Sequence, residues 1–255
     1  MVTKSLKKIY TFLIFCFLYA PIIILIVFSF NDSKSRGVWS GFTLRWYVEL
    51  FRDPAILKAL YYTILVAILA SLISTIIGTF AALGIHNMPG LSKKIVLNLN
   101  YLPVLNPDIV TAVSLMALYR FLKIEFGFTT MLLSHITFCI PYVVLSVLPK
   151  LKQMNIHLAE AAMDLGATPF YALRKVVIPE IMPGIITGGL MAFTLSIDDF
   201  VISFFNTGNG VSNLSIEIFA MSRRGINPTI NALSTLMFIS LLILLLIINK
   251  RTEKN

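Results

Sequence analysis

Charge and cysteine are scarce in this chain. Only 13% of its 255 residues are Asp, Glu, Lys or Arg, and 57% are hydrophobic, fractions well outside those of ordinary soluble domains. The two cysteines, Cys16 and Cys139, both fall in apolar segments, where buried thiols are a simpler interpretation than a disulfide. The chain also lacks a Gly-Lys dipeptide, which excludes a Walker loop for ATP phosphates. Lipid is therefore the first solvent to consider, and this chain is not expected to hydrolyse ATP.

Metal-binding and catalytic patterns are missing as well. The three histidines, His86, His135 and His157, show no metal-ligand spacing with carboxylates or cysteines and are interpreted as structural or solvated. We therefore assign no catalytic residue, no metal and no cofactor to this chain. The net charge of +9 could indicate nucleic acid, but the sequence has no long basic tract, so no nucleic-acid partner is predicted.

Six apolar segments are candidates for transmembrane helices. About 20 helical residues cross a hydrocarbon core of about 30 Å, and the uncharged runs 9–30 and 59–85 reach this length without interruption. Polar residues or prolines interrupt the other four, which are 95–119, 128–148, 185–205 and 227–248. Such interruptions survive in lipid only where neighbouring helices or a wet cavity satisfy the backbone. The sequence predicts an all-α polytopic membrane protein, a single domain over 1–255 with an interior pathway.

The basic residues favour one orientation of these helices. With both termini in the cytoplasm, just over half of the 21 basic residues fall on the inner side, which is a modest positive-inside bias. The outer loop 31–58 then contains an amphipathic stretch with Trp46, Tyr47, Leu50 and Phe51 on one helical face. A helix lying at the membrane interface is preferred to a binding site for this stretch, because aromatic rings are stable at that depth.

Two more outer loops are predicted, a short hairpin at 123–127 and a glycine-rich loop at 206–226. The inner segment 150–183, between the fourth and fifth spans, is much longer than a connector requires. It predicts an amphipathic helix from about Ile156, a turn at Gly166, and a second short helix that ends near Pro179. So long a segment is expected to have a function of its own.

A spaced motif stands in this inner segment. It consists of Glu160-Ala161-Ala162, three residues, Gly166, nine residues and Val176-Val177-Ile178-Pro179. The motif resembles the EAA signature of bacterial ABC-importer permeases, which is Glu-Ala-Ala, three residues, Gly, nine residues, Ile, any residue, Leu and Pro. Here Val176 replaces the Ile and Ile178 replaces the Leu. An ordinary loop helix is the alternative interpretation.

The resemblance implies that this segment forms coupling helices that dock on a cytoplasmic ATPase subunit. Ala161 and Ala162 would permit close backbone approach, Glu160 would meet a basic or hydrogen-bonding partner, and Gly166 would permit the turn. Pro179 would end the second helix. These five residues are the predicted ATPase-coupling residues.

The resemblance to this family extends over nearly the whole chain. The stretch 195–208 is similar to the fifth-helix segment of the spermidine/putrescine permeases. This implies a polyamine substrate, a bacterial inner-membrane location in contact with lipid, and transport by alternating access. The implied partners are a second homologous permease, two ATPase subunits that bind ATP and Mg, and an extracytoplasmic substrate-binding protein.

Acidic residues in or near the spans are candidates for the substrate pathway. Asp198 and Asp199 are costly in lipid unless a wet cavity, a neighbouring helix or a basic partner stabilises them. As neighbours on a helix they would differ by about 100°, so only one would face the pathway. Asp108 follows a proline and either caps a half-helix or lines the pathway. Glu217, in an outer loop, could guide a cation inward or contact the binding protein.

Aromatic residues complete the predicted pathway. Tyr142, Phe204 and Phe205 could hold a polyamine by cation–π contact, worth about 0.5–2 kcal/mol each, although packing is the more common role of such rings. Three alternatives to a polyamine importer remain open. They are an importer of another small solute such as ferric ion or sulfate, a secondary transporter, and a membrane assembly or sensor subunit that moves no solute.

Overall fold

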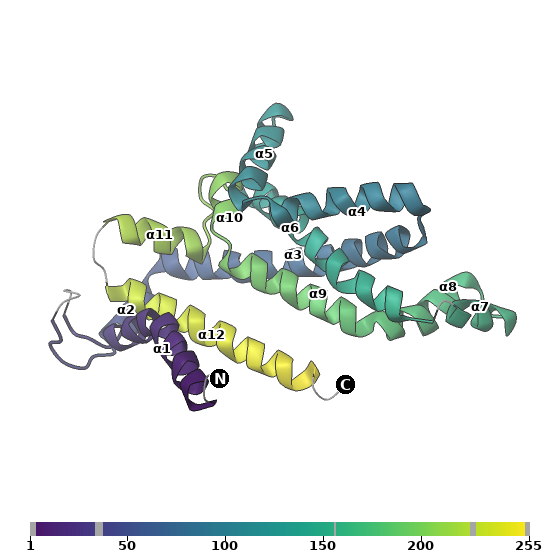
Figure 1. The fold of residues 1–255 in the computed structure, drawn as a ribbon. Helices are drawn as coiled ribbons and strands as arrows, with labels where there is room; N and C mark the ends of the chain where they lie inside the picture. The colour runs from purple at the N-terminus through teal and green to yellow at the C-terminus, as the bar shows by residue number, and fades with distance from the viewer. Residues whose placement is uncertain (1–3, 34–37, 156, 225–227, 253–255) are drawn as a thin grey trace. The chain divides into compact units, whose positions relative to one another are not determined.

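The computed structural model describes four stretches of the chain, residues 4–33, 38–155, 157–224 and 228–252. Every named secondary-structure element in these stretches is a helix, as Figure 1 shows. The prediction of an all-α protein is therefore confirmed for the residues that the structure describes. The predicted helix start at Ile156 lies outside them.

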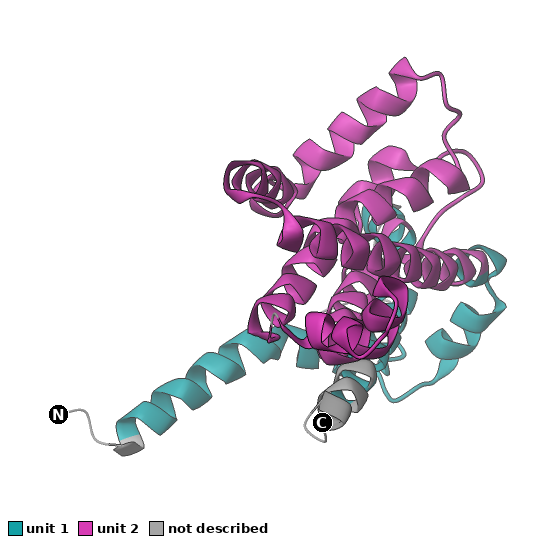
Figure 2. Cartoon of the chain, turned by 90° about the vertical axis from the view of Figure 1, so that its right-hand side faces the viewer, with its two compact units in different colours: residues 1–57, 217–255 teal, residues 58–216 magenta. Residues whose placement is uncertain are grey.

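The chain divides into two compact units, which Figure 2 shows in different colours. Unit 1 contains residues 1–57 and 217–255, and unit 2 contains residues 58–216. Helix α3 begins just before the first division, and α11 (Leu214–Arg224) spans the second. The prediction of one permease domain over the whole chain stays a prediction.

Unit 1 is built from helices near the two ends of the chain, which are α1 (Lys4–Phe28), α2 (Arg45–Arg52) and α12 (Pro228–Thr252). Both α1 and α2 pack against α12. The apolar stretch Leu6–Phe28 of α1 is long enough to cross a membrane, as predicted for 9–30. The described apolar part of α12, Pro228–Ile243, is shorter than a full span.

The predicted amphipathic outer helix exists as α2, but its apolar face is divided. Trp46 is only 2% exposed, and its indole N–H donates a hydrogen bond of 2.7 Å to the main-chain oxygen of Asn31. Leu50, one turn later, is also buried, whereas Phe51 is exposed. The prediction that Trp46, Tyr47, Leu50 and Phe51 form one interfacial surface is therefore wrong, because Trp46 and Leu50 pack inside the protein.

Unit 2 contains most of the helices. In chain order they are α3 (Pro54–Asn87), α4 (Gly90–Leu105), α5 (Asp108–Phe121), α6 (Phe128–Gln153), α7 (His157–Asp164), α8 (Pro169–Ala172), the π-helical segment η1 (Leu173–Val177), α9 (Ile178–Asp198) and α10 (Val201–Asn206). Helices α3 and α6 are each long and apolar enough to cross a membrane, and so is the continuous helical stretch Pro169–Asp198. At 34 residues, or about 51 Å, α3 is longer than the hydrocarbon core is thick.

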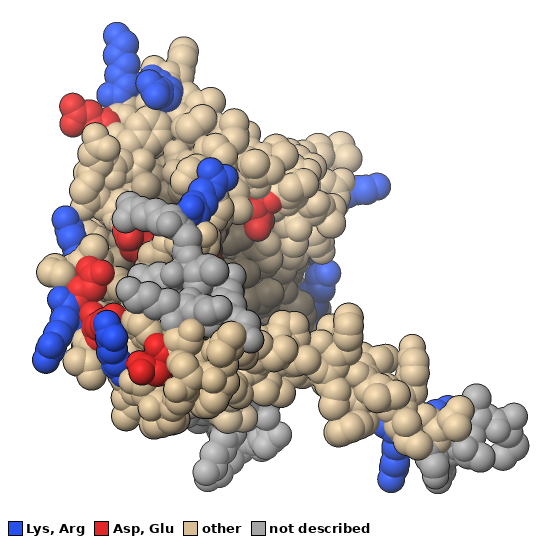
Figure 3. All heavy atoms as spheres, turned by 90° about the vertical axis from the view of Figure 1, so that its left-hand side faces the viewer, with Lys and Arg blue, Asp and Glu red and all other residues tan. Residues whose placement is uncertain are grey.

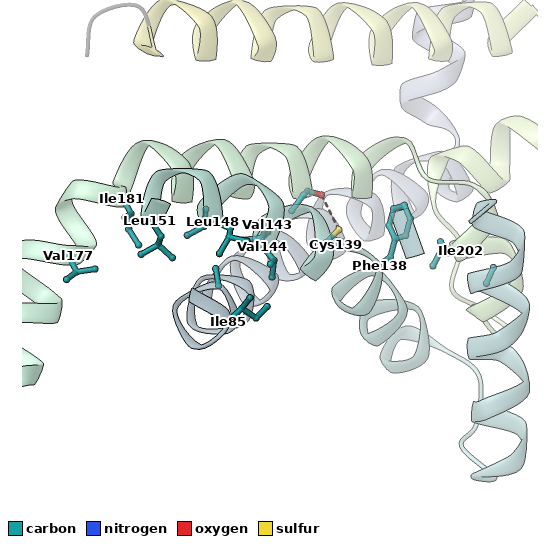
Figure 4. Packing of buried hydrophobic residues seen from close by; sticks show 14 residues of the cluster. Ile85, Phe138, Cys139, Val143, Val144, Leu148, Leu151, Val177, Ile181 and Ile202 are labelled. Carbon is teal, nitrogen blue, oxygen red and sulfur yellow. Dashed lines mark hydrogen bonds between the residues drawn. The ribbon is translucent and has the colours of Figure 1, made fainter. Parts of the chain in front are cut away.

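Helix α6 carries much of the buried core of unit 2. Figure 4 shows Phe138, Val143 and Leu148 among the buried side chains along this helix, which packs against α9. Glycines allow very close approach to α6, since a Cβ added to Gly188 would lie 3.1 Å from the Cα of Val143 and one added to Gly78 would lie 2.7 Å from its Cβ. Such close packing holds helices together in lipid, where hydrophobic transfer from water contributes little.

The third predicted span, 95–119, is not one straight helix. Helices α4 and α5 are bent by 106° at Asn106 and Pro107. Pro107 cannot donate the next helical hydrogen bond and disfavours a helical conformation in the residue before it. Asn106 is accordingly extended, with φ −79° and ψ 148°. The described residues thus contain four candidate spans, or five if α4 and α5 together form one.

The surface is largely uncharged. On the face shown in Figure 3, Lys, Arg, Asp and Glu stand singly or in small groups with wide uncharged areas between them. Large apolar side chains elsewhere on the chain are strongly exposed, among them Phe17, Leu105 and Phe121. A surface of this kind suits contact with lipid better than contact with water.

Candidate functional site

The acidic pair lies where the fifth predicted span, 185–205, is broken. Helix α9 ends at Asp198, Asp199 is extended with φ −61° and ψ 127°, and α10 begins at Val201. The prediction that the two carboxylates stand about 100° apart on one continuous helix is therefore wrong. Because the backbone turns at Asp199, its side chain is buried while that of Asp198 is exposed.

The Asp199 carboxylate stabilises the start of α10. Its Oδ1 accepts a hydrogen bond of 3.1 Å from the backbone N–H of Ile202, and its Oδ2 accepts one of 2.8 Å from the backbone N–H of Ser203. The Ser203 hydroxyl donates a third bond, of 3.0 Å, to Oδ2. The two backbone N–H groups are otherwise unsatisfied donors of a helix N-terminus, where a negative charge is also favourable. Asp199 therefore has a clear structural role.

Five buried polar side chains surround this break, and we call them the break network: His135, Ser196, Asp199, Ser203 and Asn213. The ring of His135, on α6, lies 2.7 Å by Nδ1 from the Ser196 hydroxyl and 2.8 Å by Nε2 from the Ser203 hydroxyl. The Asn213 amide donates to the Ser203 hydroxyl at 2.7 Å and to the main-chain oxygen of Asp199 at 3.0 Å. The network thus ties α6, α9, α10 and the loop before α11 together.

A third aspartate, Asp108, lies within electrostatic range of this break. Asp108 lies in the first turn of α5, and the charge of Asp199 acts on both Asp108 and Asp198. Asp108 is not a helix cap, because the capping position is Pro107 and no side chain there accepts a hydrogen bond. The predicted half-helix after the break exists and Asp108 lies in its first turn, near the helix N-terminus, but one residue inside the capping position that Pro107 occupies. Asp199 therefore lies within electrostatic range of both Asp108 and Asp198.

The predicted aromatic residues are arranged around the same part of unit 2. Tyr142, on α6, is half-buried, lies within electrostatic range of Asp108, and packs edge-to-face on Phe138 with ring centres 5.4 Å apart. Phe204, on α10, is exposed, with its ring 5.2 Å from that of Phe200. Phe205 packs against the core. Glu217, in the first turn of α11, lies beyond the residues of unit 2.

The predicted coupling residues lie mainly on one exposed tip, which consists of residues 157–172. Glu160, Ala161 and Ala162 are on α7, and Glu160 accepts a hydrogen bond of 2.8 Å from the exposed ring of His157. Gly166 ends this helix with φ +90°, a left-handed conformation that favours glycine. The next N–H, of Ala167, donates back to the oxygen of Ala162 at 3.1 Å, which completes the turn.

The tip carries an open apolar hollow of about 500 Å³. Its lining consists of Ala162, Leu165, Gly166, Ala167, Thr168 and Tyr171. Leu165 is 91% exposed and Tyr171 is also largely exposed. The Thr168 hydroxyl accepts the N–H of Tyr171 at 3.3 Å, which caps α8. The tip therefore has an apolar surface that no described residue of unit 2 covers.

Pro179 was predicted to end the second helix of this segment, and this prediction is wrong. It lies at the start of α9, and helical structure runs without a gap from Pro169 to Asp198. The preceding segment η1 has π geometry, in which the N–H of Ile178 bonds to the oxygen of Leu173, five residues back. A proline ring clashes with the carbonyl four residues earlier in an α-helix, and a wider turn relieves this clash.

Sequence reasoning missed several residues of the site. His135 was interpreted only as structural or solvated, and its buried, hydrogen-bonded position bears out the structural interpretation. Ser196, Ser203 and Asn213 were not singled out, although a histidine in an apolar span must find buried partners and was therefore a usable signal. Leu165 was also missed, because one exposed leucine in a polar loop has no distinctive pattern. No group of three or more His, Cys, Asp or Glu side chains able to hold a metal occurs in the described part of the chain.

The chain is similar to known proteins in both sequence and structure. Residues 74–254 match the family described as "Binding-protein-dependent transport system inner membrane component". The chain is 38% identical over 246 residues to the spermidine/putrescine transport system permease protein PotC of Escherichia coli K12, covering 96% of this chain and 93% of PotC. It is 40% identical over 234 residues to the putrescine transport system permease protein PotI of the same organism, covering 87% and 82%.

A solved structure shares the fold. It is a bacterial alginate ABC transporter in complex with an alginate pentasaccharide-bound periplasmic protein, and it matches with a TM-score of 0.69 over 96% of this chain and 90% of that one. The sequence identity is 19%, so this likeness concerns the fold alone.

Proposed function

The chain belongs to the family of binding-protein-dependent transport system inner membrane components, and from this membership we propose that it is a permease subunit of an ATP-driven importer of polyamines. It would move spermidine or putrescine across the bacterial inner membrane by alternating access. The observation that carries the proposal is the similarity over nearly the full length to PotC. The acidic surroundings of the α9–α10 break support it independently.

The substrate class is supported by charge. Polyamines carry two to four positive charges, and the carboxylates of Asp108, Asp198 and Asp199 would attract such a cation where they are ionised. Asp198 is the exposed member of the pair and would meet the substrate directly, whereas Asp199 would hold the break in shape. Exposed Phe204 and half-buried Tyr142 could add cation–π contacts of about 0.5–2 kcal/mol each. Glu217 would attract the cation or contact the binding protein.

Six spans with both termini in the cytoplasm are the proposed topology. The pair α4–α5 would count as one broken span and α12 as the sixth. Two observations within unit 2 support this arrangement. The α3–α4 turn lies at the same end as α7 and α8 in Figure 1, as two inner loops should. At the other end, the loop at Gly208 touches the loop at Phe126, as two outer loops should.

The exposed tip would transmit the action of ATP. Glu160, Ala161, Ala162 and the apolar hollow would dock on an ATPase subunit, with Leu165 and Tyr171 covered in the complex. The complex would contain two such ATPase subunits, which bind ATP and Mg, together with a second homologous permease and an extracytoplasmic binding protein. Pro179 would contribute indirectly, by setting where α9 starts.

The first experiment is uptake of labelled spermidine and putrescine by a bacterium that lacks its own polyamine uptake and expresses this chain with its neighbouring permease, ATPase and binding-protein genes. We expect uptake that requires this chain and ATP. An assembled complex without polyamine uptake would redirect the substrate to ferric ion, sulfate or another solute. Uptake by the chain without an ATPase partner would instead indicate a secondary transporter.

Gly166→Ala should weaken coupling without disturbing packing. A Cβ at Gly166 meets no atom within 4 Å, but its φ of +90° is unfavourable for an L-residue by about 1–2 kcal/mol. The turn would relax and the tip would shift, so we expect about tenfold less polyamine transported per ATP hydrolysed.

The matched control for this change is Gly90→Ala. A Cβ at Gly90 also meets no atom within 4 Å, and its φ is not in the left-handed region. Transport and ATP hydrolysis are measured together in proteoliposomes. A normal ratio for Gly166→Ala would contradict the coupling role of the tip.

A further inference from the structure

One imidazole connects the two sides of the α9–α10 break. His135 is 1% exposed and belongs to α6, the helix that carries much of the core of unit 2. Its Nδ1 reaches Ser196, three residues before the break, and its Nε2 reaches Ser203, in α10. The same Nε2 lies 3.6 Å from Oδ2 of Asp199, too far for a hydrogen bond.

The hydrogen-bond partners determine where the protons lie. The Ser203 hydroxyl gives its single hydrogen to the Asp199 carboxylate, which can only accept. The oxygen of Ser203 also receives a hydrogen from Asn213. Its contact with His135 must therefore use its second lone pair, which requires a hydrogen on Nε2. The chain of donors runs from His135 through Ser203 to Asp199.

The other ring nitrogen is then the acceptor. With one hydrogen on Nε2, a neutral imidazole accepts at Nδ1, and the Ser196 hydroxyl supplies the donor at 2.7 Å. Both Asn213 amide hydrogens are likewise used, one for Ser203 and one for the oxygen of Asp199. A charged imidazolium would place a second donor at Nδ1 and would force Ser196 to turn its hydrogen away.

We propose that His135, neutral and protonated at Nε2, is a positioning residue that fixes the geometry of the α9–α10 break and thereby aims the exposed Asp198 carboxylate into the transport pathway. That Asp198 lines a pathway, and what the pathway carries, rest on the proposed function, but the tautomer and the link across the break do not. His135 touches no substrate in this role. It acts from the buried helix α6 on the residues that hold Asp199, the direct neighbour of Asp198.

Solid-state NMR of the full-length chain, labelled with 15N-histidine and reconstituted in lipid bilayers with its partner subunits, tests the tautomer. The chain has three histidines, and the His135→Gln spectrum identifies the His135 signals by difference. We expect one protonated and one unprotonated ring nitrogen, with the proton on Nε2. A doubly protonated ring, or the proton on Nδ1, would overturn the proposal.

Two substitutions test the positioning role. Gln keeps a hydrogen-bond donor near the Nε2 position, whereas Leu keeps only the volume of the side chain. We therefore expect the KM for uptake by His135→Gln to stay within about threefold of the parent value, and that of His135→Leu to rise about tenfold. His86→Gln is the control and should match the parent. An unchanged KM for His135→Leu, or equal losses for Leu and Gln, would overturn the positioning role.

Failure of this inference is distinguishable from failure of the proposed function. If the parent complex moves no polyamine, the substrate assignment fails, and the NMR measurement still decides the tautomer and the link. If His135→Leu does not assemble, the comparison of His135→Gln with the parent and the NMR spectrum still decide the proposal.

Discussion

Gly208→Ala is expected to destabilise the protein by about 3 kcal/mol or more, because the new methyl group would collide with backbone. A Cβ at Gly208 would overlap the carbonyl oxygen of Phe126 and lie 2.9 Å from the backbone nitrogen of Gly127. Neither can rotate away as a side chain can. Moreover, Thr130, in the first turn of α6, donates a hydrogen bond of 2.8 Å to the oxygen of Asn206, which holds the two loops together.

The measurement for Gly208→Ala is unfolding in mixed detergent micelles, together with the amount of protein in the membrane. Gly84→Ala is the matched control, because a Cβ at this position in α3 meets no atom within 4 Å. Alanine is a better helix former, so this control should be neutral or stabilising by about 0.5–1 kcal/mol. If both variants unfold alike, the close approach of the loops at Gly208 and Phe126 does not exist.

Asp199→Ala is expected to lower the free energy of unfolding by about 2–4 kcal/mol, whereas Asp198→Ala should change it by less than about 0.5 kcal/mol. The first substitution leaves the buried N–H groups of Ile202 and Ser203 without their acceptor and removes the partner of the Ser203 hydroxyl. The second removes an exposed carboxylate. Substitutions at these two neighbouring residues should therefore separate an effect on stability from an effect on transport.

Polyamine uptake completes this comparison. Asp198→Asn should assemble normally but take up polyamine at least tenfold less efficiently, because one attractive charge is lost from the pathway. Asp199→Asn keeps one oxygen acceptor and should be less damaging to folding than Asp199→Ala. Stable Asp199→Ala protein would contradict the capping role, and unchanged uptake by Asp198→Asn would remove this residue from the pathway.

Hydropathy alone was sufficient to predict the uninterrupted helices. Apolar runs without charge predicted α1 and α3, and the run 128–148 predicted α6, because in lipid a long apolar segment can satisfy its backbone only as a helix. The bend at Asn106 also had a local cause, since Pro107 cannot continue a helix. Its angle of 106° was not predictable, because it depends on how α5 packs against α6 and α10.

The break at Asp199 had no comparable local signal. No proline or glycine lies at this position, and the residues on both sides form helix. The extended conformation is stabilised by partners far away in the sequence, His135 on α6 and Asn213 before α11. The acidic pair could therefore be identified from composition, but the division into one buried and one exposed aspartate could not. Pro179 was misjudged because a proline fits the first turn of a helix as well as the residue after its end.

The continuous helical stretch from Pro169 to Asp198 would act as a mechanical lever in the proposed transport cycle. Its 30 residues span about 45 Å, so a tilt of about 5° at the tip displaces the opposite end by about 4 Å. That displacement is about the width of one methylene chain, which is the cross-section of a linear polyamine. A small rocking of this helical stretch would thus be enough to open or close the surroundings of Asp198, provided that η1 and Pro183, which both lie within it, do not bend.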